Sequence, residues 1–472
     1  MIEKVSILGY RCPKCGHEWL PRKGKTPRVC PNPECHTLLY GEDNNGKIEK
    51  LNVDDESDVI ARGTEINFRE RIADRRRTDY LTHAFFPYPA KFIPQIPRYF
   101  IKEYMHNHHT LLDPFCGSGT TLVEAQMLGY ESYGIEINPL GRLLTEVKTT
   151  PLNLTKFKVE YEKLIQRLES GEIEPLIPEF PNKDYWFPKH IQEELGKIRK
   201  SIEEVKDESI KKFFLVCMVA IIRKCSNADP RISKPVYTAK MKLNQERKID
   251  VLKSFKSKVL EYRERVFTLS NFLESNTVKA TVIGNDAREI KLPDSSVYMV
   301  LTSPPFINAQ EYFRTTKFEI YWTGLATPEE VKDMESKMVG LERVSNKDIN
   351  ELHQLNLAGL EKIDEITRRI YETDRQRAFI FYDYFVQMIK VFNEVKRVLY
   401  DEGFFVITIG DNTIRKIHIK THELVISAAK HVGFMPITVN YDLIKVRQLS
   451  TKRNSTAGLM DKEWAMVFKK NL

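Results

Sequence analysis

Residues 110–139 read TLLDPFCGSGTTLVEAQMLGYESYGIEINP, and they predict a strand, a tight turn, a helix and a second strand in succession. The first strand is short and apolar, and it ends at Asp113. Glycines 117 and 119 form the turn, and apolar residues at helical spacing follow it as far as Gly129. The second strand, SYGIEIN, carries Glu136 near its end.

This unit suits a nucleoside cofactor. A glycine turn that opens onto a helix lets backbone N–H groups approach a ligand closely, and an acidic residue at the next strand end can hold ribose hydroxyls. A phosphate-binding Walker loop is excluded, because no lysine follows the turn. A dinucleotide site is disfavoured, because Leu122 stands where that fingerprint has its third glycine.

A second motif lies far downstream, at Thr302-Ser-Pro-Pro-Phe306. Taken with Asp113-Pro-Phe-Cys-Gly-Ser-Gly-Thr120, it resembles the S-adenosylmethionine-dependent methyltransferases that modify exocyclic amino groups of DNA bases. The resemblance covers about 220 residues in separated blocks. It implies an α/β fold with a Rossmann-like, doubly wound methyltransferase sheet over roughly 80–472. The expected architecture also has a helical insertion and a small N-terminal zinc ribbon, which lie outside the resemblance.

The resemblance also assigns the S-adenosylmethionine site. Asp113 and the turn would surround the methionyl part, Glu136 would hold the ribose, and Asp286 would accept a hydrogen bond from the adenine amine. Residues 82–100 are rich in proline and contain one lysine, Lys91. A rigid wall of this kind suits the amino-acid carboxylate of the cofactor, although the segment could also be an aromatic loop that merely packs. The cofactor-binding residues implied are Tyr88, Pro89, Ala90, Lys91, Asp113, Phe115, Gly117, Gly119, Thr120, Thr121, Glu136, Asn138, Asp286 and Ala287.

The implied catalytic residues are Ser303, Pro304, Pro305 and Phe306. An exocyclic amine is a poor nucleophile because its lone pair is delocalised into the base, so the base must be flipped out and the nitrogen rehybridised. The Ser303 hydroxyl and the Pro304 carbonyl would accept its two N–H bonds, and Phe306 would stack on the base. Family members with serine here mostly act on cytosine N4, and those with aspartate on adenine N6. Phe306 replaces the usual tyrosine, which keeps the stacking surface and loses a hydroxyl.

Four cysteines form two close pairs near the N-terminus: Cys12, Cys15, Cys30 and Cys35. This spacing is typical of a structural Zn²⁺ ribbon in a reducing compartment rather than of disulfides. The alternative is four unliganded thiols.

Composition sets wider limits. The chain has 472 residues, 42% of them hydrophobic, and a net charge of +8, which fits a polyanionic partner without requiring one. No long apolar run or signal peptide occurs, so we expect a cytoplasmic protein without a membrane partner. The domains expected are a zinc ribbon at 1–45, a linker and arginine-rich segment at 46–80, methyltransferase parts at 81–150 and 276–472, a helical insertion at 151–275 that could recognise the target, and a polar insertion at 307–375.

The function expected is methylation of duplex DNA with base flipping, at cytosine N4, with a restriction or defence-system partner as a possibility. Adenine N6 of DNA and the base amines of RNA are alternative substrates. A zinc-ribbon DNA-binding or assembly protein without catalysis is a different class. The acidic residues at 113, 136 and 286 argue against it, because a protein that only binds has no need of them.

Overall fold

The computed structural model describes residues 63–72, 77–106, 109–232, 234–238, 249–273, 278–307, 312–341, 360–444 and 460–471, and the backbone of three short strands nearer the N-terminus. The chain forms two compact units, residues 1–64 and 65–472.

The first unit contains an antiparallel sheet of three strands, β1 (Leu8–Arg11), β2 (Glu18–Trp19) and β3 (Glu49–Asn52), in the order β2-β1-β3. β3 pairs with β1 along its whole length. Residues 49–52 lie in the stretch that the sequence predicted to be a linker or a small hairpin, and their backbone groups bond to the first strand. The four cysteines predicted to bind zinc lie outside the described residues.

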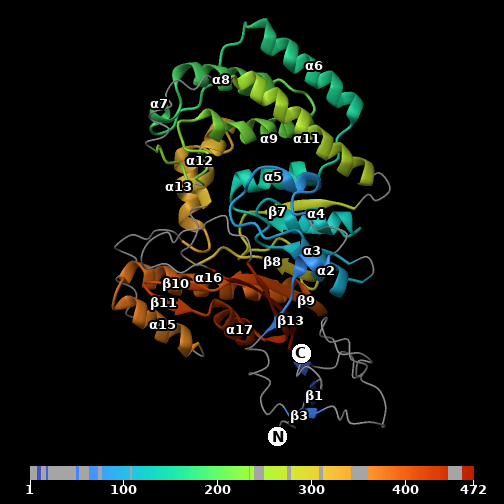
Figure 1. Ribbon diagram of the computed structural model, residues 1–472, viewed down its shortest axis with the longest axis vertical. Helices are drawn as coiled ribbons and strands as arrows, with labels where there is room; N and C mark the ends of the chain where they lie inside the picture. Colours follow the sequence, from blue (N-terminus) through green and yellow to red (C-terminus); the bar gives the residue numbers. More distant parts are fainter. Residues whose placement is uncertain are drawn as a thin grey trace. The chain divides into compact units, whose positions relative to one another are not determined.

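The second unit is built on a mixed sheet, shown in Figure 1, whose eight strands among the described residues have the order β4-β12-β13-β9-β8-β5-β6-β7. β7, β6, β5, β8 and β9 are parallel neighbours, and β13 and β12 are antiparallel. The predicted α/β fold with a mostly parallel sheet is confirmed at this level. The strands are β4 (Thr64–Glu65), β5 (Leu111–Asp113), β6 (Ser132–Ile135), β7 (Ala280–Gly284), β8 (Val297–Thr302), β9 (Leu399–Gly410), β12 (Phe434–Leu443) and β13 (Lys462–Lys470).

The order of the parallel strands determines where a ligand can bind. Counted from β5, it is 3-2-1-4-5, so the chain turns one way after β5 and the other way after β8. Such a switch point leaves a crevice outside the carboxyl ends of the two strands. Asp113 ends β5 and Thr302 ends β8, so both predicted motifs begin at this crevice.

Helices cover both faces of the sheet. On one face Val406 and Val467 pack in a cluster with Phe100 of α3. On the other, the ring of Phe405 lies 5.4 Å from that of Phe392 of α16. The helices beside the sheet are α2 (Phe68–Arg71), η3 (Leu81–Ala84, a 3₁₀ turn), α3 (Gln95–Tyr104), α4 (Thr120–Met127), α5 (Pro139–Thr149), α15 (Glu361–Tyr371), α16 (Arg375–Val398) and α17 (Thr421–Val432), together with the hairpin of β10 (Asn412–Ile414) and β11 (Ile417–Ile419).

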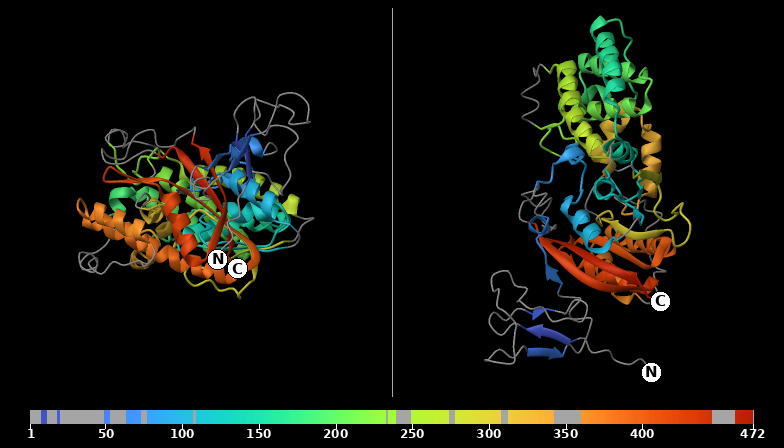
Figure 2. Two further views of the ribbon diagram at one scale, coloured as in Figure 1. Left: turned by 90° about the horizontal axis from the view of Figure 1, so that it is seen from below. Right: turned by 90° about the vertical axis from the view of Figure 1, so that its right-hand side faces the viewer.

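A helical part lies to one side of the sheet, as Figure 1 and the right-hand view of Figure 2 show. It consists of α6 (Leu154–Ser170), α7 (Lys183–Trp186), α8 (Lys189–Glu203), α9 (Glu208–Cys225), α11 (Val251–Leu273), α12 (Tyr312–Thr323) and α13 (Pro328–Lys337). α12 packs on α9 in one hydrophobic core that also includes α5. The helical insertion and the start of the predicted polar insertion thus form one structure, because Phe313, Phe318 and Trp322 of α12 are buried in that core.

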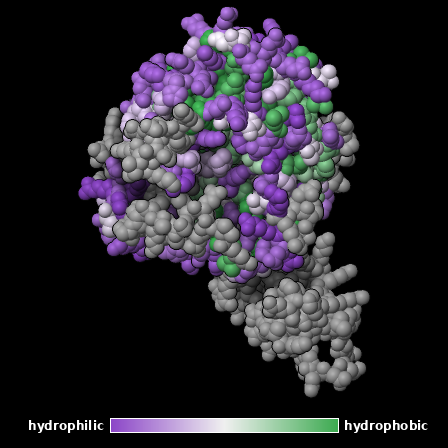
Figure 3. All heavy atoms as spheres, turned by 45° about the horizontal axis from the view of Figure 1, so that its top comes forward, coloured by the Kyte–Doolittle hydropathy of each residue, from purple (hydrophilic) through white to green (hydrophobic). Residues whose placement is uncertain are grey.

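The face of the molecule in Figure 3 carries mostly hydrophilic residues, with hydrophobic residues in scattered patches. Exposed apolar side chains of the helical part include Leu154, Val159, Leu260 and Phe272. Scattered apolar residues of this kind are normal on a water-facing surface. In the part of the chain that the structure describes, none of the helices is both long and apolar enough to span a membrane.

Candidate functional site

The glycine turn after β5 is the tightest part of the crevice. Gly117 and Gly119 have φ of +53° and +77°, and Gly119 is the N-cap of α4. A Cβ on Gly119 would lie 2.8 Å from the side chain of Thr145, so a larger residue is excluded by both backbone and space. The turn therefore brings backbone without side chains at 117 and 119 to the start of a helix.

Asp113 ties this turn to the catalytic motif. Its carboxylate accepts hydrogen bonds from the Thr121 hydroxyl at 2.6 Å, the Thr302 hydroxyl at 2.6 Å and the Phe115 N–H at 3.1 Å. The side chain is fully buried, which raises its pKa to about 6. Three of the about four acceptor positions of this carboxylate are thus used inside the protein, so Asp113 ties the two turns together, and its expected place beside the methionyl part stays a prediction. Thr121, also expected at the cofactor, serves the same link.

A buried lysine supports the turn from the protein side. Lys148 of α5 is fully buried, and its ammonium donates a hydrogen bond of 2.5 Å to the Ser118 carbonyl. Burial holds the pKa of Lys148 well below its ordinary value. The Thr145 hydroxyl donates to the Gly117 carbonyl at 3.1 Å. These carbonyls bond inward, so the turn is fixed before any ligand binds.

The proline-rich wall is anchored by the buried Glu124 of α4. Glu124 contacts His83 Nε2 at 2.7 Å and the Arg98 guanidinium at 3.0 Å. Lys91 Nζ donates to the His83 carbonyl at 2.8 Å, and burial lowers the pKa of this lysine. Tyr88, Pro89, Ala90 and Lys91 all line the cavity.

Glu136 follows β6 and faces the same cavity. One carboxylate oxygen accepts the Asn138 N–H at 2.7 Å. Burial raises the pKa of Glu136 to about 7. Asn138, expected to bind the cofactor, is mostly engaged elsewhere: its amide oxygen caps α5 at Leu140 N–H, and its amide nitrogen donates to the Thr316 hydroxyl of α12.

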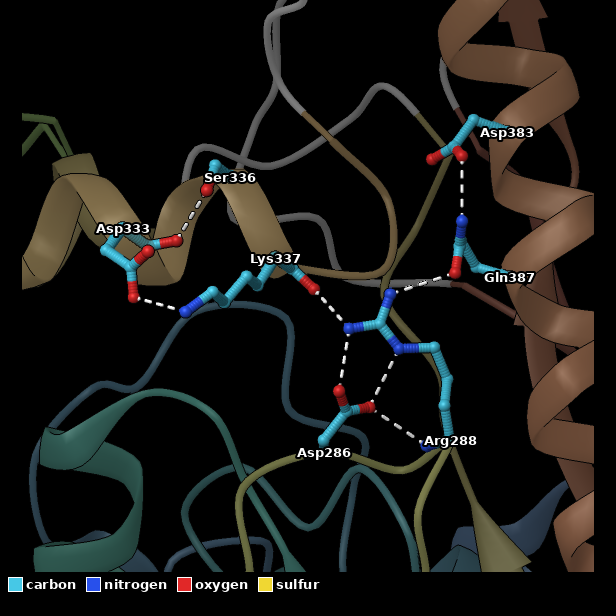
Figure 4. A network of polar contacts seen from close by, with 7 residues as sticks. All are labelled: Asp286, Arg288, Asp333, Ser336, Lys337, Asp383 and Gln387. Atoms are coloured by element: carbon cyan, nitrogen blue, oxygen red, sulfur yellow. Dashed lines mark hydrogen bonds and ion pairs between the residues drawn. The ribbon is translucent and has the colours of Figure 1, made fainter.

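Asp286 follows β7 and forms a two-pronged ion pair with Arg288 (Figure 4). The guanidinium Nε and a terminal nitrogen donate to the two carboxylate oxygens at 2.8 and 2.7 Å. Burial acts to raise the pKa of Asp286, but these hydrogen bonds outweigh it and leave that pKa below its ordinary value. Asp286 is therefore a carboxylate near neutral pH.

The turn after β8 contributes Ser303 and Pro305 to the cavity. The Ser303 side chain makes no hydrogen bond within the described part of the chain, and it is half-buried. Pro304 is buried. The Asn412 side chain donates to the Ile307 carbonyl and so holds the end of this turn against the sheet.

One cavity joins most of the residues singled out in the sequence. Those lining it are Tyr88, Pro89, Ala90, Lys91, Phe115, Gly117, Thr120, Glu136, Asn138, Asp286, Ala287, Ser303 and Pro305. Asp113, Gly119, Thr121, Pro304 and Phe306 are not among its lining residues. β5 and β8 pair directly, so the two turns meet there by sheet topology.

Several lining residues were missed. Tyr312 and Phe313 come from α12, and Met338 and Val339 follow α13. Tyr384 of α16 lies next to this segment, and its fully buried hydroxyl makes no hydrogen bond within the described residues. No local pattern marks these side chains, because only the packing of helices far apart in the sequence brings them to the crevice.

The chain is similar to known DNA methylases. The family described as DNA methylase, of the N6/N4 group, matches residues 41–140. Type II methyltransferase M.MvaI of Kocuria varians is 27% identical over 80% of this chain and 87% of its own. Type II methyltransferase M.BsoBI of Geobacillus stearothermophilus is 24% identical over 65% of each chain. The chain is thus similar to type II methyltransferases over most of its length.

Among solved structures, a SAM-dependent methyltransferase of Methanosarcina mazei matches 79% of this chain and 97% of its own, with 10% identity. The TM-score of 0.30 is too low to support any argument from that likeness.

Proposed function

We infer that this chain, an S-adenosylmethionine-dependent DNA methyltransferase, transfers the methyl group to an exocyclic base amine of duplex DNA, namely cytosine N4. The single observation that carries the proposal is that Ser303 lines one cavity with the Gly117 turn, at the ends of two paired strands. A cofactor bound over the turn would thus face the side chain that we assign to the reaction.

The residues present fit the cofactor. Glycine backbone at a helix start accommodates its methionyl part, the wall at 88–91 supplies one ammonium for its carboxylate, and the Glu136 carboxylate can accept ribose hydroxyls. Asp286 can accept from the adenine amine. S-Adenosylmethionine, when bound, supplies an electrophilic methyl group on a sulfonium.

Ser303 and Pro304 would prepare the nucleophile. An amine held by two acceptors directs its lone pair away from the ring and toward the methyl donor. The Ser303 hydroxyl is open for this purpose, and proline at 304 fixes the backbone angles that aim its carbonyl. Phe306 would stack on the flipped base. Positioning then supplies most of the rate enhancement.

Serine at 303, rather than aspartate, supports cytosine N4 over adenine N6. The relatives carry the name type II methyltransferase, which supports a role in a restriction–modification system beside a partner nuclease.

We also propose that Cys12, Cys15, Cys30 and Cys35 hold one structural Zn²⁺, on the support of their spacing. Metal analysis of the purified chain should give one zinc per chain, and serine at all four positions should remove it.

Nucleoside analysis tests the proposed substrate. The chain is incubated with labelled S-adenosylmethionine and unmethylated duplex genomic DNA, or with RNA transcribed from it, and the digested nucleosides are separated. We expect label in N4-methyl-2′-deoxycytidine from DNA. Label in N6-methyl-2′-deoxyadenosine would replace cytosine N4 by adenine N6, and label only in RNA nucleosides would replace DNA by RNA. Cofactor binding without label in any nucleoside would favour the non-catalytic alternative.

A further inference from the structure

A short segment at the end of α13, residues 337–341, borders the cavity on one side, and we call it the strap. Ser336 and Lys337 are exposed, whereas Met338, Val339 and Gly340 are all buried. Met338 and Val339 line the cavity. A Cβ on Gly340 would lie 3.3 Å from the Cβ of Pro305. The strap therefore reaches from the cavity wall to the catalytic turn.

Arg288 connects the strap to two other elements, as Figure 4 shows. Besides the ion pair with Asp286, it donates to the Lys337 carbonyl at 2.9 Å and to the Gln387 amide oxygen of α16 at 2.9 Å. Four of its five N–H donors are thus used. The guanidinium is planar and rigid, so these contacts fix the relative position of β7's end, the strap and α16.

The hydrogen bonds to Asp286 leave one acceptor position open. A carboxylate offers about four lone pairs. One oxygen accepts both the Arg288 backbone N–H at 2.9 Å and its Nε at 2.8 Å, and the other accepts a terminal guanidinium nitrogen at 2.7 Å. A single lone pair remains on the second oxygen, and Asp286 lines the cavity.

We propose that Arg288 is a positioning residue for the cofactor: it aims the remaining lone pair of Asp286 at the adenine amino group. The inference rests on the proposed function, because it takes the ligand of Asp286 to be the adenine of S-adenosylmethionine. Arg288 itself touches neither reacting atom.

A purely structural ion pair makes a different prediction. The two side chains are 21% and 36% exposed, and pairs that water reaches contribute little to stability. If the pair only held the loop, its loss would weaken all ligands of the cavity equally. If Arg288 aims Asp286, its loss would weaken only ligands that carry the amino group.

Calorimetric titration separates the two. The probes are S-adenosylhomocysteine and its analogue with unsubstituted purine in place of adenine, titrated into wild type, Arg288→Lys, Asp286→Ala and the double variant. Lysine keeps the charge and loses the planar fork. Asp333→Ala is the matched control, since it removes the exposed ion pair of Asp333 with the Lys337 side chain and leaves Arg288 untouched.

We expect wild type to prefer the adenine ligand about tenfold, the effect of one hydrogen bond to a charged group. Arg288→Lys should remove most of that preference and leave the affinity for the purine ligand unchanged. In the Asp286→Ala background, Arg288→Lys should cause no further loss of the preference. Asp333→Ala should keep it.

Equal weakening of both probes in Arg288→Lys, or an undiminished preference, would overturn the inference. A wild type that binds both probes alike would overturn the assignment of Asp286 as well. Failure to bind either probe would instead refute the cofactor site as a whole, so the two failures are distinguishable.

Discussion

The turn after β5 and the turn after β8 lie side by side at the ends of paired strands, yet they use their polar groups differently. In the first, the Asp113 carboxylate and the Gly117 and Ser118 carbonyls all bond within the protein. In the second, the Ser303 hydroxyl bonds to nothing within the described residues. The carbonyls of the first turn are bonded inside the protein, although its buried Ser118 hydroxyl has no partner among the described residues, and the second turn presents the Ser303 side chain to the cavity.

This difference implies that substitutions should separate two properties. Changes in the first turn should alter cofactor affinity and stability. Changes in the second should alter turnover with the cofactor still bound. The four predictions below run from the largest expected effect to the smallest.

Asp113→Ala should impair both turns together, because Asp113 accepts hydrogen bonds from Thr121 beyond the first turn and from Thr302 before the second. It removes hydrogen bonds to a buried carboxylate and strands two threonine hydroxyls, so the free energy of unfolding should fall by about 3 kcal/mol and methylation should be lost. Denaturant unfolding and labelled methyl transfer measure both. Thr302→Val removes only one of the donors to Asp113, so it is the milder variant and should keep measurable cofactor binding. Unchanged cofactor affinity in Asp113→Ala would contradict the role of the link.

Ser303→Ala should lower turnover and leave cofactor binding unchanged, and so separate the roles of the two turns. The turnover number should fall by about 100- to 1000-fold, as for loss of one preorganised polar group at a reacting centre. The dissociation constant of S-adenosylhomocysteine should stay within about twofold, because no contact of the first turn changes. Single-turnover transfer and calorimetry check this, and parallel loss of binding and turnover would speak against the division.

Gly119→Ala should affect binding through shape alone. Its φ of +77° and the nearby Thr145 make a Cβ costly, so we expect about 2 kcal/mol of destabilisation and about tenfold weaker cofactor binding. Gly171 has almost the same φ, +78°, but open space around it. Gly171→Ala should therefore cost about 1 kcal/mol and leave affinity unchanged. Equal effects of the two variants on affinity would mean that the turn does not shape the site.

The smallest effect concerns pH. Burial raises the pKa of Glu136 to about 7, and the ionised form is the better acceptor for ribose hydroxyls. Affinity for S-adenosylhomocysteine should therefore fall as pH drops from 8 to 6, by about tenfold, because about a tenth of a group with that pKa is ionised at pH 6. Glu136→Gln should bind weakly at every pH and show a flat profile. A wild-type profile equally flat would remove Glu136 from the ribose site.

The sequence predicted the elements that local patterns encode. The glycine turn, the strands that lead into Asp113 and Ser303, and the acidic residue after β6 all follow from residues within one or two elements. The enzyme class also followed, because two motifs in one order specify it more sharply than either alone. The match to type II methyltransferases confirms that class.

What the sequence missed depends on contacts between distant residues. Buried Asp113 accepts a hydrogen bond from Thr302, which is 189 positions away in the sequence. The role of Arg288 depends on its hydrogen bonds to Lys337 and Gln387, which are also distant in the sequence. The sequence also did not predict the burial of α12 and of residues 338–340 in the strap. Both lie within a stretch of polar composition, and a partly apolar helix or three buried residues in such a stretch give no local sign of burial.

The most direct test of the central claim is a crystal structure of the chain with S-adenosylhomocysteine. We predict that the sulfur atom lies between the Gly117 turn and the Ser303 hydroxyl, with the ribose at Glu136 and the adenine amine at Asp286. A ligand bound in the reverse direction, with adenine at Ser303 and the sulfur at Asp286, or one bound outside this cavity, would contradict it.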